Sequence, residues 1–432
     1  ASGLQFRDSW RLSWVGRSNT STTRDPYFAS PFPAFVRRIQ ARKPRFRHKP
    51  EVRCAPGSLS VMRTSRRARA AGVIVGGLLL GTFVFGAVDI GTAESIDSAE
   101  VAMSTTTTPI VETTTSLMAA TEPDASDTTS MTESASIEPE RQDLVIHAVG
   151  DVALDSDYIV DFRSQGYAYA FNGLDGLFEA DDLTVINLEC APSTLGTPLD
   201  KTFVFRCPPS ALAVAHTNGV DVVNLANNHS QDYGTTAMLD GLLQSRLAGL
   251  EPVGVGADLA GATRPAIIEV GGWKIAVLGM GGVVPGQSWL ATDERPGMAS
   301  GDDIEQMAAS VRAAGDMADF VLVTIHWGIE GESTPRADDR ARAVAMIEAG
   351  ADAIFGHHPH RLGELEIVDG VPVYWTLGNF IWPRLSDASA TSGVARLEIG
   401  PTGDIEACLL PAFIERSGQP SLTGPRTCEA SG

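Results

Sequence analysis

From about Asp143 to about Arg416, short apolar runs alternate with longer amphipathic segments. Six runs rich in Val and Ile predict strands, at residues 143–149, 183–188, 221–225, 274–280, 319–325 and 352–355. Amphipathic segments predict helices at residues 210–219, 235–250, 302–315 and 338–350, two of which end at Gly219 and Gly350. This alternation of strands and helices predicts an α/β fold.

Two further segments carry hairpin signals. Gly271-Gly272 and Asp369-Gly370 each lie between apolar runs, and such pairs favour the tight turns that join antiparallel strands. Antiparallel hairpins beside an alternating pattern predict mixed sheets. Two sheets packed between layers of helices would accommodate both patterns.

The residues before this part predict a membrane segment. Residues 1–69 hold 16 of the 33 Lys and Arg residues and 3 of the 53 Asp and Glu residues, a net +13, which leaves −33 for the remainder. Residues 70–88 carry no charge over 19 positions, close to the roughly 20 that span a bilayer as a helix. Because arginines precede this segment, the positive-inside rule puts the following domain outside the cytoplasm on a single-pass anchor. Gly91-Thr92-Ala93 also fits a cleavage site, in which case the protein is secreted.

The other flanking segments have no periodic pattern. We interpret residues 1–60 of the basic segment 1–69 either as an extension from a misplaced start or as a disordered tail. Residues 89–142 are rich in Thr, Ser, Glu and Pro, a composition typical of a flexible and sometimes glycosylated linker. We expect one folded domain at residues 143–416, with residues 417–432 as a C-terminal tail.

Polar side chains follow each apolar run where a strand would end. They are Asp151, Glu189, Asn227, Asn228, His229, His326, Glu330, His357, His358, His360 and Asn379. In α/β sheets, ligands bind beyond the carboxyl ends of the strands, so these side chains are expected to meet. Oxygen and imidazole donors without thiolate suit one or two Mn, Fe or Zn ions, which can promote hydrolysis. Pro359 is expected to keep the HPH segment extended, with both of its imidazoles on one side.

Several single residues have more specific expectations. Arg206 is a candidate for bidentate contact with an anionic substrate. We also consider Glu330, His357 and Asn379 as substrate contacts and His229 as a proton donor. Asp232 and Gly234 are expected to shape the start of the next helix, and Trp327 is expected to serve packing.

The motifs "GDVALD", "NLE", "FRC", "NNHSQDYG", "HWGIE", "GHHPH" and "LGNFIW" resemble, in this order, the capsule-synthesis CapA family, which is associated with poly-γ-glutamate. That family is similar to the calcineurin-like metallophosphatases. The resemblance implies an α/β/β/α four-layer sandwich, catalytic roles for His229 and Asp151, and metal ligation by Asp151, Glu189, Asn228, His326, His358 and His360. Two positions depart from the metallophosphatase pattern, because Ala153 stands where a histidine is usual and Glu189 stands where aspartate is usual.

Cysteine usage fits an exported domain. Cys54 lies in the basic leader, and four cysteines remain beyond the apolar segment, which allow three pairings. We favour Cys190 with Cys207 and Cys408 with Cys428, in an oxidising compartment. The first bridge would brace the loop behind Glu189.

The net charge of the part beyond residue 69 disfavours some classes of function. The net −33 beyond residue 69 disfavours nucleic-acid binding and metal-free binding of a polyanion, and the sequence contains neither a Gly-rich phosphate loop nor a nucleophile elbow. One hypothesis is a metal-dependent hydrolase acting on a phosphoester or on an anionic cell-envelope polymer. The alternative is a non-catalytic factor that assembles, exports or tethers such a polymer.

Overall fold

The computed structural model describes residues 37–38 and 140–428. Among these residues, one sheet of nine strands has the path β1-β18-β17-β2-β3-β6-β7, with β16 beside β2 and β19 beside β18. Its strands are β1 (Arg37–Arg38), β2 (Leu144–Val152), β3 (Leu183–Leu188), β6 (Val222–Asn224), β7 (Glu251–Val253), β16 (Asn379–Ile381), β17 (Thr391–Ile399), β18 (Ile405–Arg416) and β19 (Gln419–Leu422).

The second large sheet of the described part has the order β14-β15-β13-β12-β10-β9. Its strands are β9 (Ala266–Val270), β10 (Trp273–Gly281), β12 (Phe320–His326), β13 (Ala353–His357), β14 (Leu365–Val368) and β15 (Val371–Tyr374). Short strand pairs join β4 (Ala191–Pro192) with β5 (Arg206–Cys207) and β8 (Val255–Gly256) with β11 (Gly297–Met298). Both large sheets contain parallel and antiparallel pairs, which confirms the predicted mixed α/β class.

The helices are α1 (Phe162–Gln165), α2 (Pro209–Thr217), α3 (Thr235–Leu247), α4 (Leu259–Ala262), α5 (Ile304–Gly315), α6 (Ala337–Ala349) and α7 (Asp387–Ala390). Single 3₁₀ turns lie at η2 (Tyr167–Ala170), η3 (Asn172–Leu174) and η4 (Gln287–Trp289). The helix α6 ends before Gly350, whose φ is +117°, as predicted. Helix α2 ends at Thr217, two residues before Gly219.

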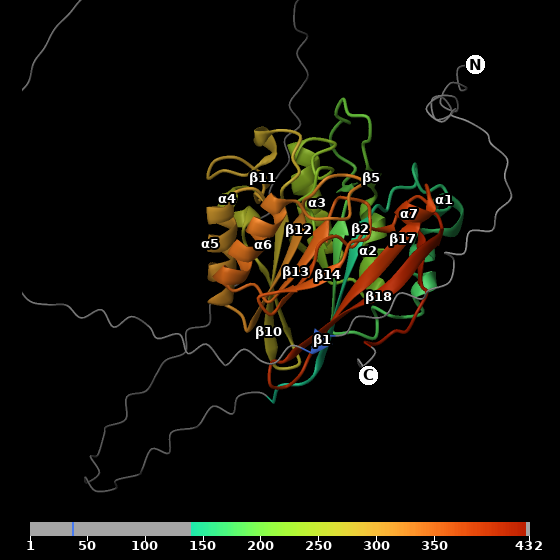
Figure 1. The fold of residues 1–432 in the computed structure, drawn as a ribbon. Helices are drawn as coiled ribbons and strands as arrows, with labels where there is room; N and C mark the ends of the chain where they lie inside the picture. The colour runs from blue at the N-terminus through green and yellow to red at the C-terminus, as the bar shows by residue number, and fades with distance from the viewer. Residues whose placement is uncertain (1–36, 39–139, 429–432) are drawn as a thin grey trace, which may run out of the picture. The chain divides into compact units, whose positions relative to one another are not determined.

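Three apolar clusters hold the layers together. Alternate residues of β2 face opposite sides, so Ile146 packs between the two sheets while Val149 packs on the outer side. The inter-sheet cluster joins β2, β3 and β6 to β10, β12 and β13. The clusters on the outer faces contain residues of α2 and α3 on one side and of α5 and α6 on the other. The sheets therefore lie face to face between helices, and Figure 1 shows α5 and α6 along one side.

The two predicted hairpins are present. Gly271 and Gly272 join β9 to β10, and Asp369 and Gly370 join β14 to β15. All four residues have positive φ, from +49° to +82°, as the tight turns of twisted hairpins require.

The folded part extends beyond the boundary expected at Arg416. Strand β19 pairs antiparallel with β18, and Cys428 forms a disulfide with Cys408. Residues 417–428 are therefore not a free tail, because ladder hydrogen bonds and a covalent bond fix them to the first sheet.

The predicted membrane segment at residues 70–88 lies outside the described residues, as do the basic segment 1–69 apart from residues 37–38 and the linker 89–142 apart from residues 140–142. Within residues 37–38 and 140–428, no helix combines the length and the apolar character needed to cross a bilayer.

Candidate metal centre

Polar ends of parallel strands from both sheets meet at one edge of the sandwich. Strands β2, β3 and β6 are parallel to one another, as are β10, β12 and β13. Asn187, at the end of β3, lies 3.2 Å through Nδ2 from Nδ1 of His326, at the end of β12. The carboxyl ends of strands in the two sheets therefore face each other across one site.

A backbone irregularity places Asp151. The register between β2 and β3 shifts between Val149 and Asp151, and such bulges re-aim side chains beside functional sites. The Gly378 carbonyl accepts from the Asp151 amide at 2.8 Å. A Cβ atom on Gly150 would lie 1.9 Å from that carbonyl oxygen, so only glycine fits before this aspartate.

Buried amides form a network under the site. Asn187 donates through Nδ2 to Asp151 Oδ1 at 2.9 Å, and its Oδ1 accepts from Asn224 at 3.1 Å and from Asn227 at 3.3 Å. We did not single out Asn187 or Asn224 from the sequence. The sequence does mark both residues, because an amide within a fully buried apolar strand must find hydrogen-bond partners.

Glu189 is shared by two clusters of ligand-type atoms. Within the described residues, one cluster is Glu189, His326 and His358, and the other is Asp151, Glu189 and His360; the ligand-type atoms of each lie within 4.8 Å of one another. Glu189 Oε1 lies 3.6 Å from His326 Nε2 and 3.9 Å from His360 Nε2. Asn228 joins the first cluster, because its Oδ1 is 2.9 Å from His326 Nε2.

The two carboxylates have opposite pKa shifts. Burial raises the pKa of Glu189 well above its usual range, and the charge of Asp151 raises it further. For Asp151, burial alone raises the pKa, but the hydrogen bond and charge of His360 outweigh that effect, so its pKa lies below the usual range. Fully buried Glu189 lacks such a compensating partner.

Burial keeps most of the site imidazoles neutral. It lowers the pKa of His357 and of His358 to about 4, and it lowers the pKa of His326 well below the usual value. Burial also lowers the pKa of His360, but Asp151 outweighs it, so the net shift is upward. Neutral imidazole is the form that binds metal ions.

Asp232 holds His229 from behind. Its Oδ2 accepts from the Phe205 amide at 2.8 Å and lies 2.6 Å from His229 Nδ1. Lys201 donates to Asp232 Oδ1 and, at 2.7 Å, to the Asn228 carbonyl. The opposite nitrogen of His229, Nε2, lies 3.9 Å from Glu189 Oε1. His229 thus presents Nε2 to the candidate centre.

The expected role of Asp232 at the helix start is therefore wrong. Helix α3 has Gly234 at its N-cap with φ +84° and no side-chain cap, so Gly234 alone shapes that start. Asp232 is fully buried and bonds to His229 and Lys201 instead, because an uncompensated buried carboxylate would be costly. No hydrophobic pattern or motif in the sequence marks Lys201 as a residue of the site.

The HPH segment is not extended, contrary to expectation. His358 and His360 have φ values of +95° and +54°, in the left-handed region that costs energy for non-glycine residues. Pro359 does not prevent this, because it restricts its own φ and not theirs. The two left-handed residues still bring both imidazoles to the site, and each joins a different cluster.

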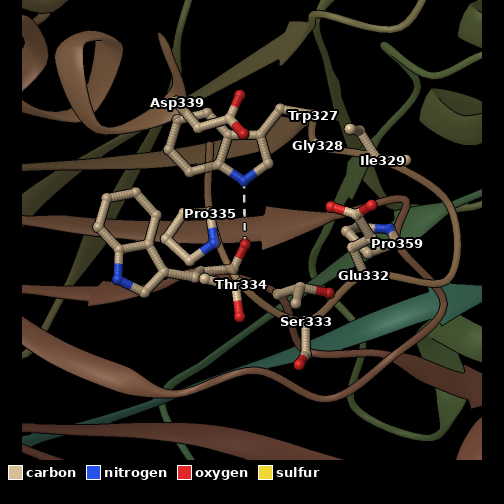
Figure 2. A pocket seen from close by; sticks show the side chains of 11 residues that line it. Trp327, Gly328, Ile329, Glu332, Ser333, Thr334, Pro335, Asp339 and Pro359 are labelled. Atoms are coloured by element: carbon tan, nitrogen blue, oxygen red, sulfur yellow. Dashed lines mark hydrogen bonds between the residues drawn. The ribbon is translucent and has the colours of Figure 1, made fainter. Parts of the chain in front are cut away.

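The back of this turn is packed by the loop after β12. Figure 2 shows Pro359 beside Gly328, Ile329 and Glu332, and the Gly331 amide donates to the Pro359 carbonyl at 2.8 Å. Trp327 donates to the Trp375 carbonyl at 3.0 Å, which confirms its packing role. The cavity here, about 10 Å³, has room for one water at most, so it is no substrate site.

The remaining candidates occupy different surroundings. Arg206 donates to the Leu195 carbonyl, and its guanidinium lies 3.4 Å from the Tyr233 ring centroid, so the loop of residues 194–204 engages it. Glu330 is exposed, but its charge reaches Glu189 and His360.

His357 lies on the inner side of the site. Its Nε2 is 2.8 Å from Thr324 Oγ1, and its Nδ1 is 3.9 Å from Asp151 Oδ1. Because His357 is 1% exposed, it is placed beneath the centre and not on a substrate path.

A disulfide flanks the shared carboxylate. Cys190 directly follows Glu189 and bonds to Cys207, with Cα atoms 5.7 Å apart. The bridge ties the carboxyl end of β3 to β5 and closes the loop that carries Lys201. Cys408 bonds to Cys428 in the same described part.

The donor set fits divalent cations. Both carboxylate oxygens of Glu189 are buried without a hydrogen-bond partner among the described residues, as is Nδ1 of His358. Buried polar groups are normally paired, and Glu189 and His358 belong to one cluster, so their unpaired atoms are the feature that a cation would satisfy. Carboxylate, amide and imidazole ligands suit Mn, Fe or Zn.

Fold and site together define an α/β protein with a candidate divalent-metal centre. Residues 145–384 match the family of the bacterial capsule synthesis protein PGA_cap. The "PGA biosynthesis protein CapA" of Bacillus subtilis is 31% identical over 277 residues, covering 61% of this chain and 72% of that protein. The "Capsule biosynthesis protein CapA" of Bacillus anthracis is 28% identical over 280 residues, covering 61% and 68%. The chain belongs to the CapA family of poly-γ-glutamate capsule synthesis proteins.

One solved structure has a low similarity to this chain. A Staphylococcus aureus protein named for 5'-nucleotidase activity aligns over 62% of this chain and 54% of its own, with 15% identity and a TM-score of 0.40. Similarity at that level is too low to support a conclusion.

Proposed function

We propose that this protein is a metal-dependent hydrolase that acts in poly-γ-glutamate or cell-envelope metabolism, on a metallophosphatase-like fold. The observation that carries the proposal is Glu189, whose two buried oxygens have no hydrogen-bond partner and which lies between two imidazole-containing clusters. A buried, unpaired carboxylate is costly for stability. Its membership of both clusters, together with five other donor side chains, supports selection for cation binding over selection for stability.

The donors would form two cation positions that share Glu189. Asp151, Glu189 and His360 would hold one cation, and Glu189, His326, His358 and Asn228 the other. Divalent ions there would supply positive charge that stabilises charge developing on a phosphoryl or amide oxygen of the substrate.

His229 would transfer the proton. Its Nε2 faces the centre, and Asp232 at Nδ1 fixes the tautomer and would stabilise the charged ring, as carboxylates do for catalytic histidines. His229 would donate a proton to the leaving group of an anionic polymer or phosphoester substrate.

Metal removal tests this function directly. We expect the purified protein to contain divalent metal and to hydrolyse a phosphoester or a γ-glutamyl polymer, and we expect EDTA to abolish turnover. Mn²⁺ at about 100 times its dissociation constant should stabilise the EDTA-treated protein by about 2.7 kcal/mol. Elemental analysis, a hydrolysis screen and thermal unfolding measure the three effects. Absence of hydrolysis with Mn²⁺, Fe²⁺ or Zn²⁺ would end the enzyme proposal.

One observation favours the non-catalytic alternative. Ala153 supplies no ligand where metallophosphatases have a histidine, and the relatives are named for capsule biosynthesis. A factor that assembles, exports or tethers the polymer would bind metal and polymer without turnover. Protein that binds metal and hydrolyses no tested substrate, but binds the polymer in a binding assay, would identify the non-catalytic factor.

We also propose that residues 70–88 anchor the protein in the membrane with the CapA domain outside. The two disulfides support this topology, because such bonds persist in oxidising compartments. Alkaline phosphatase fused after Gly432 is expected to be active in a bacterial host, and a fluorescent reporter that folds only in the cytoplasm should be dark at the same position. The reverse pattern would contradict the topology.

A further inference from the structure

Asn379 connects the candidate centre to a surface turn. It begins β16, is 1% exposed and pairs with Asp151 across parallel strands. Its Nδ2 donates to the Ser389 carbonyl at 3.0 Å. Because a carbonyl can only accept, this bond fixes the amide with Oδ1 toward His360, whose Nδ1 lies 2.8 Å away. His360 is therefore the donor and Asn379 the acceptor.

The turn that fixes Asn379 is itself well held. Ser386 caps the short helix α7, and its Oγ accepts from the Ser389 amide at 3.2 Å. Ser389 Oγ donates back to the Ser386 carbonyl at 3.0 Å. The position of the Ser389 carbonyl, and with it the orientation of the Asn379 amide, is set by this cap.

The two nitrogens of His360 face different groups. Nδ1 lies 3.0 Å from Asp151 Oδ2 as well as near Asn379, while Nε2 lies 3.9 Å from Glu189 Oε1. Histidines that ligate metal through one nitrogen usually donate the other N–H to a carbonyl or carboxylate. If Asp151 held a cation, it would accept the Nδ1–H hydrogen bond more weakly, and Asn379 would then be the main acceptor.

The cation position at Asp151 would have few protein ligands. Ala153 is buried and carries no donor, so the described carboxylate and imidazole side chains that would hold a cation here are those of Asp151, Glu189 and His360. His360 also has a left-handed backbone with φ +54°, a conformation that needs support from its surroundings. When only three side chains hold a cation, the orientation of each one affects the affinity for that cation more than it would in a larger set of ligands.

We propose that Asn379 is a positioning residue that fixes the tautomer and orientation of His360 and so sustains cation binding at the Asp151 position despite Ala153. This deepens the proposed function, because it rests on a cation at that position. It assigns Asn379 to the metal centre and not to substrate contact.

The test is Mn²⁺ titration calorimetry on the EDTA-treated full-length protein. Asn379→Ala is expected to weaken one Mn²⁺ position about 10–100-fold, the usual effect of removing an outer partner of a ligand. Asn379→Asp keeps an acceptor toward His360 but cannot donate to the Ser389 carbonyl, so it should restore only part of that affinity. Asn218→Ala is the matched control, because it removes an amide that donates to the Val214 carbonyl at 2.7 Å at the C-terminal end of α2.

Thermal unfolding in EDTA shows whether the variants fold. If the alanine variant is unfolded, Asn379→Leu has nearly the same shape without an acceptor and takes its place. Wild-type Mn²⁺ affinity at every position in a folded Ala or Leu variant would overturn the inference, as would wild-type protein binding no Mn²⁺. Wild-type protein that binds Mn²⁺ without hydrolysis would overturn only the hydrolase proposal, since this readout is binding.

Discussion

Glu189→Gln is expected to remove divalent-metal binding at both positions of the centre at once. Glu189 belongs to both ligand clusters, so the change takes one charged ligand from each, whereas His358→Ala takes one from a single cluster. We expect Mn²⁺ affinity to fall on the order of 100-fold or more, beyond the 10–100-fold typical of outer partners. Titration calorimetry and elemental analysis measure the loss, and hydrolysis should disappear with it.

The metal-free variant provides the control. Burial raises the pKa of the Glu189 carboxyl, and a hydrogen bond to Asp151 also favours its neutral form. Gln resembles that neutral side chain, because its amide can donate to Asp151 in the same way. EDTA-treated Glu189→Gln should therefore unfold at no lower temperature than EDTA-treated wild type. Full Mn²⁺ binding by the variant would refute a shared ligand, and a large loss of metal-free stability would point to a structural role.

His229→Ala is expected to lower turnover while leaving metal content nearly unchanged. His229 Nε2 faces Glu189 at 3.9 Å, but His229 belongs to neither ligand cluster. Loss of a general acid typically costs 10²–10⁴-fold in rate. Turnover of the hydrolysed substrate and metal content by elemental analysis are the two measurements.

Two further variants sharpen this prediction. Asp232→Asn should also lower turnover, because it disturbs the partner of His229 Nδ1, whereas His216→Ala changes an exposed histidine on α2 and should have no effect. A His229→Ala protein with wild-type turnover would exclude proton donation by this residue. Loss of metal together with turnover would instead make His229 a ligand.

The sequence by itself determined the order of elements and the residues at their ends. Runs of Val and Ile with the period of buried strands indicated β3, β10 and β12, and the Gly271-Gly272 pair indicated a hairpin, because local backbone preferences decide both features. The same local patterns put Asp151, Glu189 and His326 at strand ends. Local preference was insufficient at His358 and His360, where surrounding contacts hold a left-handed backbone that the sequence around Pro359 does not favour.

Only the tertiary structure decided which of these side chains meet and through which atoms. The pairing of Glu189 with two clusters depends on how the two sheets face each other, which is set by packing between residues far apart in the chain. Two partners of Asp232, Lys201 and Phe205, likewise come from a loop some thirty residues earlier. The link from Asn379 to His360 requires β16 to lie beside β2. Such contacts are non-local, so no window of sequence contains them, although the buried polar residues that need partners can be recognised in advance.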